Sequence, residues 1–286
     1  MYDCAGRLAT QETLSGKSLE EIGRCFGGKS DQAIGKATTR FKEKLSEDPQ
    51  LKARVKNEKF DLGIALDGDA DRIAAVAPGG VFIHPQKILG LLALHLNQDR
   101  HWSGGLVKTI CGSTMMDNIA KFLGIKLYET PVGFKYISDL METQDIVAGG
   151  EEAGGMGVKN YIPERDGTMA GLLLIEMMVY RNKNILKILN ETEKQFGKFY
   201  YVRQDFHIDR RVEPKKESLP KELLGKKVVD IKDYDGIKLI CEDQSWLMFR
   251  GSGTEPIMRT YAEAKSLTQA KKLLALGKEI ILKEGV

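Results

Sequence analysis

The sequence predicts an α/β protein, with mixed-sheet α/β domains followed by a small α+β domain at the C-terminus. Short apolar strands alternate with helical patterns between residues 62 and 197, an order typical of sheets covered by helices on both faces. After residue 197, strand-like runs dominate and a helical pattern from Ser266 to Leu282 ends the chain. We expect three units at residues 1–83, 84–197 and 198–286, and residues 1 to about 60 are too poor in strands to form a complete domain.

The first strands surround an acidic loop. Leu62–Leu66 is an apolar run that predicts a buried strand ending where three carboxylates begin. Ile73–Ala77 and Val81–Ile83 predict two further strands, separated by a bend at Pro78–Gly80 because proline and glycine favour turns.

Strands and helices then alternate. A helical period follows His84, and Asp166 is a plausible cap for a helix over Met169–Arg181. In the order of the chain, the other predicted elements are a strand at Leu106–Ile110, a helix at Ser113–Gly124, a strand at Ile125–Thr130, a turn entering a helix at Val132–Ile137, and strands at Asp145–Gly150, Phe199–Arg203, Lys227–Ile231, Ile237–Cys241, Ser245–Arg250 and Thr260–Ala264.

Composition narrows the class of protein. The formal net charge of +3 is too small to indicate a nucleic-acid or membrane partner, and no apolar run approaches the length of a membrane span. Cys4, Cys25, Cys111 and Cys241 are far apart and form no Cys-x-x-Cys pair, so we expect buried thiols in a reducing cytoplasm. Met1–Arg7 shows no signal-peptide pattern, and the oligomeric state is not predicted.

Asp67, Asp69 and Asp71 are the candidate metal ligands. Three carboxylates this close together are tolerable only if they are solvated, protonated or share a cation. Hard oxygen ligands suit Mg²⁺, which takes a few carboxylates together with a phosphate oxygen. An ordinary acidic turn is the alternative, although the apolar lead-in and Arg72 count against it. A calcium loop is excluded because its sixth and twelfth positions would be Arg72 and Pro78.

Three other segments could bind a phosphorylated ligand. Arg250–Pro256 combines glycines, hydroxyls and an arginine, with Arg259 just downstream, which favours a phosphate site over a plain turn. Gly149–Gly155 holds paired glutamates that could accept hydrogen bonds from sugar hydroxyls, although in isolation a solvated turn is the better interpretation. Lys135, at a strand-to-helix turn, is either an ordinary surface lysine or a group near a transferring phosphate. Together these loops suit phosphoryl transfer on a phosphorylated polyol.

Several motifs, in the same order, resemble those of the α-D-phosphohexomutase superfamily, the phosphoglucomutase/phosphomannomutase group. Asp67–Arg72 matches its Asp-Gly-Asp-x-Asp-Arg metal loop, and Arg250–Pro256 matches its Arg-x-Ser-Gly-Thr-Glu-Pro phosphate loop. Gly150–Gly154 matches the Gly-Glu-x-Ser-Gly sugar loop except at one residue. Thr130–Lys135 and Glu164–Thr168 also resemble family segments.

The resemblance implies a reaction in which a phosphoserine and a hexose monophosphate exchange phosphoryl groups through a hexose bisphosphate, which also acts as activator. It implies Mg²⁺ on the three aspartates and a hexose phosphate as partner. It further implies catalytic roles for Lys135 and Arg72, and substrate contacts at Gly133, Glu151, Ala153, Arg250, Ser252, Gly253, Thr254 and Arg259.

Two departures from the family pattern matter. None of the four histidines follows a serine, so the Ser-His-Asn-Pro type phosphoserine loop is absent, and the resemblance implies a chain that begins inside the second family domain. Ala153 replaces the sugar-loop serine, and a lost hydrogen bond to a substrate hydroxyl is worth about 1 kcal/mol.

We therefore expect a phosphohexomutase whose 286 residues do not complete the reaction alone. A non-catalytic sugar-phosphate-binding paralogue or fragment is the alternative. A Mg²⁺-dependent phosphatase has little support, because no nucleophilic Asp motif precedes a threonine. The sequence does not distinguish glucose from mannose or another sugar phosphate.

Overall fold

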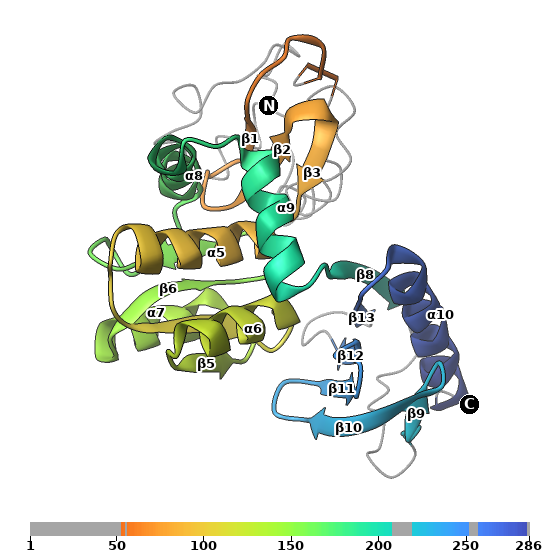
Figure 1. Ribbon diagram of the computed structural model, residues 1–286. Coiled ribbons are helices and arrows are strands. Elements are labelled where there is room, and N and C mark those ends of the chain that lie inside the picture. The colour runs from red at the N-terminus through yellow and green to blue at the C-terminus, as the bar shows by residue number, and fades with distance from the viewer. Residues whose placement is uncertain (1–52, 55, 208–218, 252–256, 285–286) are drawn as a thin grey trace, which may run out of the picture.

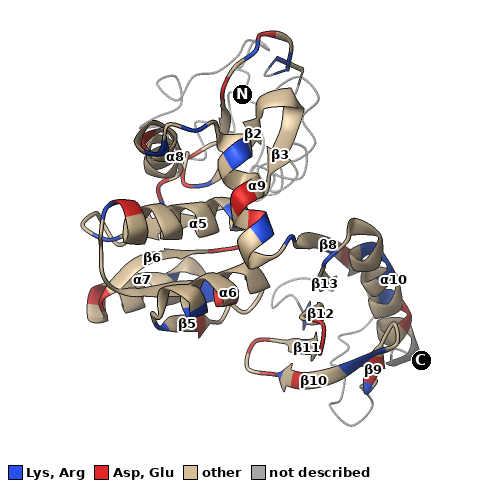
Figure 2. Cartoon of the chain, in the orientation of Figure 1, with Lys and Arg blue, Asp and Glu red and all other residues tan. Residues whose placement is uncertain are grey.

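The computed structural model describes residues 53–54, 56–207, 219–251 and 257–284. Predictions for Cys4, Cys25, Ser252, Gly253 and Thr254 lie outside this described part. Figure 1 shows a larger body, coloured orange to green, and a smaller blue body built from the C-terminal elements. Basic and acidic residues are interspersed along both bodies, in keeping with the small net charge (Figure 2).

The larger body begins with a three-stranded antiparallel sheet of β1 (Gly63–Leu66), β2 (Ile73–Ala77) and β3 (Val81–Ile83). A 3-10 turn at Pro78–Gly80 joins β2 to β3, which confirms the predicted bend. The prediction of a buried first strand is wrong in part, since only Gly63 of β1 is fully buried. The reason is position: among the described strands, β1 pairs with β2 alone and forms an edge.

The central sheet is mixed, as predicted. Its order is β5-β4-β6-β7, with β4 (Gly105–Thr109) parallel to β5 (Leu127–Thr130) and β6 (Ile146–Gly150), and with β7 (Met156–Val158) antiparallel to β6. The helices of this body are α5 (Pro85–Leu94), which continues into a π-helical turn at His95–Asp99, α6 (Thr114–Leu123), α7 (Phe134–Thr143), α8 (Gly167–Arg181) and α9 (Ile185–Phe196).

Hydrophobic clusters cover both faces of this sheet. Successive side chains of a strand point to opposite faces, so Leu106 packs in the large cluster with α5, α6 and α9, whereas Val107 packs with Ile137 of α7. The large cluster also includes Ile73 and Ile83 of the first sheet. Because the two sheets share one core, the predicted boundary between residues 83 and 84 stays a prediction.

The smaller body is a six-stranded antiparallel sheet in the order β8-β13-β12-β11-β10-β9, with one covering helix, α10 (Leu267–Glu284). Its strands are β8 (Tyr200–His207), β9 (Glu222–Leu223), β10 (Lys226–Lys232), β11 (Ile237–Cys241), β12 (Trp246–Gly251) and β13 (Ile257–Ala264). Leu247 and Phe249 of β12 pack in the cluster that includes α10, whereas Trp246 and Met248 pack with Ile110 and Cys111 of the larger body. The sheet is therefore enclosed on two sides.

The sequence does not predict β7, β9 or α9. The two strands span three and two residues, too short for a periodic signal. Helix α9 did carry boundary signals, since Asn184 caps its first turn and Gly197 follows its last residue. Within the described part, none of the helices combines the length and apolar character needed to cross a bilayer.

Gly154 shows how closely the two sheets meet. The Ile73 N–H donates to the Gly154 carbonyl at 3.2 Å, Gly154 has φ +105°, and a Cβ on it would lie 2.7 Å from the Ile73 carbonyl oxygen. We predict that Gly154→Ala lowers the free energy of unfolding by about 2–4 kcal/mol, measured by urea denaturation. Strain and clash both contribute to this loss.

Gly79→Ala is the matched control. Gly79 also has a positive φ, +80°, but a Cβ there meets nothing within 4 Å, so only backbone strain remains and a loss of about 1 kcal/mol is expected. Equal losses in the two variants would contradict a close contact at Gly154.

Candidate functional site

The site lies where the parallel strands end. Since β4, β5 and β6 are parallel, the segments that follow them meet at one edge of the sheet, the usual ligand position in open α/β sheets. Two of these segments are Pro131–Lys135 and Glu151–Gly155. The acidic loop between β1 and β2 is fastened to the same edge, because Arg72 forms a bridge with Gly155.

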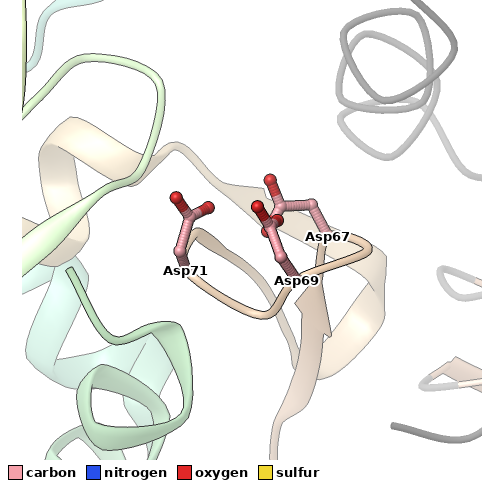
Figure 3. A group of neighbouring side chains, drawn as sticks. All are labelled: Asp67, Asp69 and Asp71. Carbon is pink, nitrogen blue, oxygen red and sulfur yellow. The ribbon is translucent and has the colours of Figure 1, made fainter. Parts of the chain in front are cut away.

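The structure brings the three aspartates together. One carboxylate oxygen from each of Asp67, Asp69 and Asp71 lies within 4.8 Å of the others, and all three side chains point to the same side of the loop (Figure 3). The Ala70 N–H donates to the Asp67 carbonyl at 3.1 Å, and Ala70 has a φ of +58°, so the loop turns tightly between the second and third acids. Asp67 is buried, at 3% exposure, and Asp69 is exposed.

This arrangement is electrostatically costly. Burial, followed by the charges of Asp71 and Asp69, raises the pKa of Asp67 to about 8. Burial also raises the pKa of Asp71. The Arg72 N–H donates to Asp67 Oδ1 at 3.1 Å, which offsets only part of the cost. Asp71 Oδ1 is buried and has no hydrogen-bond partner among the described residues. A convergent set of hard oxygen ligands, one of which is buried and accepts no hydrogen bond from the described residues, fits Mg²⁺.

Arg165 joins the acidic loop to the glutamate loop. Its Nη2 lies 2.8 Å from Asp71 Oδ2, and its Nη1 lies 3.6 Å from Glu151 Oε2. Gly155 makes room for this side chain, since a Cβ there would lie 2.4 Å from Arg165 Cδ. Sequence reasoning missed Arg165. Two signals were present: Arg165 lies in the Glu164–Thr168 segment that resembles the family, and it directly precedes Asp166, which caps α8 by accepting from the Met169 N–H at 2.8 Å.

The two glutamates have different surroundings. Glu152 accepts a hydrogen bond from Thr109 Oγ1 at 3.0 Å and so faces β4. Glu151 is 8% exposed and faces Arg165, and burial together with the charge of Glu152 raises its pKa. Ala153 is partly exposed in the turn that follows. Of the pair, Glu151 is therefore the one placed beside the acidic loop.

The two predicted catalytic cations are placed differently. Arg72 Nε lies 3.5 Å from Asp71 Oδ1 and 3.8 Å from Asp67 Oδ2. Lys135 is exposed on the first turn of α7, which begins after Gly133, and its Nζ lies 4.7 Å from the centre of the Tyr136 ring. Among the described residues, Lys135 forms no ion pair with an acidic side chain, and its catalytic role stays a prediction.

Two arginines stand side by side in the smaller body. Arg250 of β12 and Arg259 of β13 are direct partners in the antiparallel ladder, where like charges normally destabilise. Arg250 Nε donates to Asp235 Oδ1 at 2.8 Å, and although burial opposes its charge, Asp235 holds the pKa of Arg250 above its usual value. The buried Nε of Arg259 has no hydrogen-bond partner within the described residues. An anion between the two guanidinium groups would reduce their mutual repulsion and accept a hydrogen bond from Arg259.

Part of this chain matches a known protein family, and most of it is similar to named enzymes. The family described as phosphoglucomutase/phosphomannomutase, alpha/beta/alpha domain III, matches residues 84–196. A phosphoglucomutase/phosphomannomutase of Thermococcus kodakarensis is 34% identical over 230 residues, which cover 79% of this chain and 48% of that protein. A probable phosphoglucosamine mutase of Pyrococcus abyssi is 30% identical over 245 residues, covering 84% of this chain and 51% of that protein.

A solved structure agrees with these relatives. The crystal structure of a putative phosphomannomutase from Thermus thermophilus superposes with a TM-score of 0.65 and 32% identity, over 77% of this chain and 46% of that one. The chain thus spans about half the length of the curated relatives it matches. Residues 84–196 therefore belong to the phosphoglucomutase/phosphomannomutase domain III family, and most of the chain is similar to members of the phosphoglucomutase/phosphomannomutase group.

Proposed function

We propose that this chain supplies the metal, sugar and phosphate sites of a phosphohexomutase, which moves a phosphoryl group between the 1 and 6 positions of a hexose phosphate. The observation that carries the proposal is the convergence of the acidic loop and Glu151 on Arg165. The relatives are named phosphoglucomutase/phosphomannomutase and phosphoglucosamine mutase, so we propose a hexose phosphate without choosing among the sugars.

Each site has a distinct role in this proposal. Asp67, Asp69 and Asp71 would hold Mg²⁺, which when bound supplies positive charge to the transferring phosphoryl group. Glu151 would accept hydrogen bonds from sugar hydroxyls, with Gly133 and Ala153 lining the same loops, and Lys135 and Arg72 would serve near the transfer. The non-reacting phosphate would lie against Arg250, Ser252, Gly253, Thr254 and Arg259, with a hexose bisphosphate as intermediate and activator.

The proposed location is a reducing cytoplasm. Cys111 and Cys241 are free and buried, which is the state expected for thiols that serve as small apolar groups. The division into residues 1–83, 84–197 and 198–286 is also proposed, with the metal loop, the sugar loop and the phosphate loop in successive parts.

A non-catalytic sugar-phosphate-binding role is the second candidate. It is favoured by one observation, the lack of any Ser-His pair in these 286 residues, because covalent phosphoryl transfer needs a nucleophile. The two candidates share the binding sites and differ only in turnover.

The first functional prediction concerns the metal. Asp69→Asn should weaken Mg²⁺ binding at least tenfold in isothermal titration calorimetry, because it removes one of three converging charges. Asp61→Asn, an exposed charge change just before β1, is the control and should bind like wild type. Equal Mg²⁺ affinity in wild type and Asp69→Asn would remove the acidic loop from the proposal.

The second concerns the phosphate site. Inorganic phosphate should raise the melting temperature of the wild type, and Arg250→Ala should abolish most of the rise, since charge-assisted hydrogen bonds contribute roughly 1.5–3 kcal/mol each. Lys271→Ala removes an exposed positive charge from α10 and should keep the full shift. Protection that survives in Arg250→Ala places the phosphate elsewhere.

The third concerns turnover. The purified 286-residue polypeptide should bind glucose 1-phosphate but show no mutase activity in a coupled assay with Mg²⁺ and glucose 1,6-bisphosphate, because no phosphoenzyme forms. Mass spectrometry for a phosphorylated side chain checks the same point. Turnover that depends on Asp69 and on a phosphorylated residue of this chain would show that another group acts as nucleophile.

A further inference from the structure

Residues 232–236, at the end of β10 and in the turn that leads to β11, contact the larger body beside the site. We call this segment the interbody turn. Lys232 Nζ and the Tyr234 hydroxyl both donate to Glu129 Oε1, each at 2.7 Å. Asp235 Oδ2 accepts from the Val132 N–H at 2.7 Å. Glu129 and Val132 flank the end of β5, so the turn is held at the edge of the sheet where the site loops lie.

The two carboxylate oxygens of Asp235 accept hydrogen bonds from different bodies of the protein. Oδ2 holds the backbone of Val132 in the larger body, and Oδ1 accepts from Arg250 Nε at 2.8 Å in the smaller body. The side chain is 18% exposed, so both bonds form in a partly desolvated setting where they are stronger than in water. A bond through Nε leaves the Nη1–Nη2 edge of the guanidinium as the edge that would meet a phosphate.

The backbone that carries Asp235 is also fixed. Gly236 has φ +84°, and a Cβ on it would lie 2.3 Å from the Phe249 carbonyl oxygen, so the turn is seated directly on β12 beside Arg250. On β11, Lys238 Nζ donates to the Ile110 carbonyl at 2.6 Å and lies 4.1 Å from the Trp246 ring centre. The backbone that follows Asp235 is therefore fixed both to β12 and to the larger body.

We propose that Asp235 is a positioning residue for the phosphate site: it orients the Arg250 guanidinium and sets it in register with the Val132 segment of the larger body. The proposal rests on the proposed function, because it takes Arg250 as a phosphate ligand. It adds a residue that touches no substrate atom and determines how well Arg250 meets one.

The sign of the charge effect makes the proposal testable. A carboxylate beside an anion site repels the anion, so its loss should tighten phosphate binding if Coulomb interaction alone matters. Positioning has the opposite consequence. Without Asp235 the arginine samples other rotamers, and ordering it again on binding weakens the affinity.

The test is the dissociation constant of inorganic phosphate, measured by calorimetry on the full 286-residue chain. Asp235→Asn should weaken phosphate binding roughly tenfold. Asp230→Asn, the same charge change at an exposed position of β10, should not weaken it. Unchanged or tighter binding in Asp235→Asn overturns the proposal. Circular dichroism of both variants checks that they fold.

Two further measurements separate this proposal from the proposed function. If Asp235 acts through Arg250, Asp235→Asn should add little to the loss of phosphate affinity already caused by Arg250→Lys, whereas additive losses contradict the proposal.

The Val132 amide should exchange with solvent faster in Asp235→Asn than in wild type, which tests the Asp235–Val132 contact without phosphate. Equal exchange contradicts the contact. If Arg250→Ala leaves phosphate binding intact, the phosphate site itself fails.

Discussion

The mutual repulsion of Asp67, Asp69 and Asp71 is the constraint that the site depends on. Three carboxylate oxygens within 4.8 Å raise the free energy of the folded chain, and the surroundings limit that cost. Arg165 pairs with Asp71 and adds a positive charge. A main-chain hydrogen bond also fixes the loop, since the Gly167 N–H donates to the Ala70 carbonyl at 3.0 Å. A Cβ on Gly167 would lie within 2.9 Å of that carbonyl oxygen, so glycine is required where the helix α8 begins.

The second body depends on a sheet with two buried faces. On β12, Leu247 and Phe249 pack in the cluster that includes α10, and Trp246 packs against Ile110 of the larger body. The alternation places successive β12 residues on opposite sides, so the strand that carries Arg250 near its end is anchored to both a helix and the neighbouring body. Arg250 therefore holds a defined position relative to loops at the edge of the central sheet that are distant in the sequence.

Much of this arrangement could be predicted from the sequence. The helical period after His84, the helix predicted at Ser113–Gly124 and the cap at Asp166 located α5, α6 and α8, and the acidic loop was evident as a motif. The roles of Arg165 and Asp235 could not be predicted, because each acts through partners brought near it only by the fold. The catalytic role of Lys135 stays a prediction that rests on its motif position, and its side chain lies beside the Tyr136 ring.

The central claim is that one hexose phosphate is held by the acidic loop and the arginine pair together. Phosphorus NMR of glucose 1,6-bisphosphate with Mn²⁺ in place of Mg²⁺ tests it directly, because paramagnetic relaxation falls steeply with distance from the metal. The account predicts unequal broadening, with one phosphate near the aspartates and the other near Arg250, and loss of both effects in Arg250→Ala. Equal broadening of the two signals, or broadening that Arg250→Ala leaves unchanged, would contradict it.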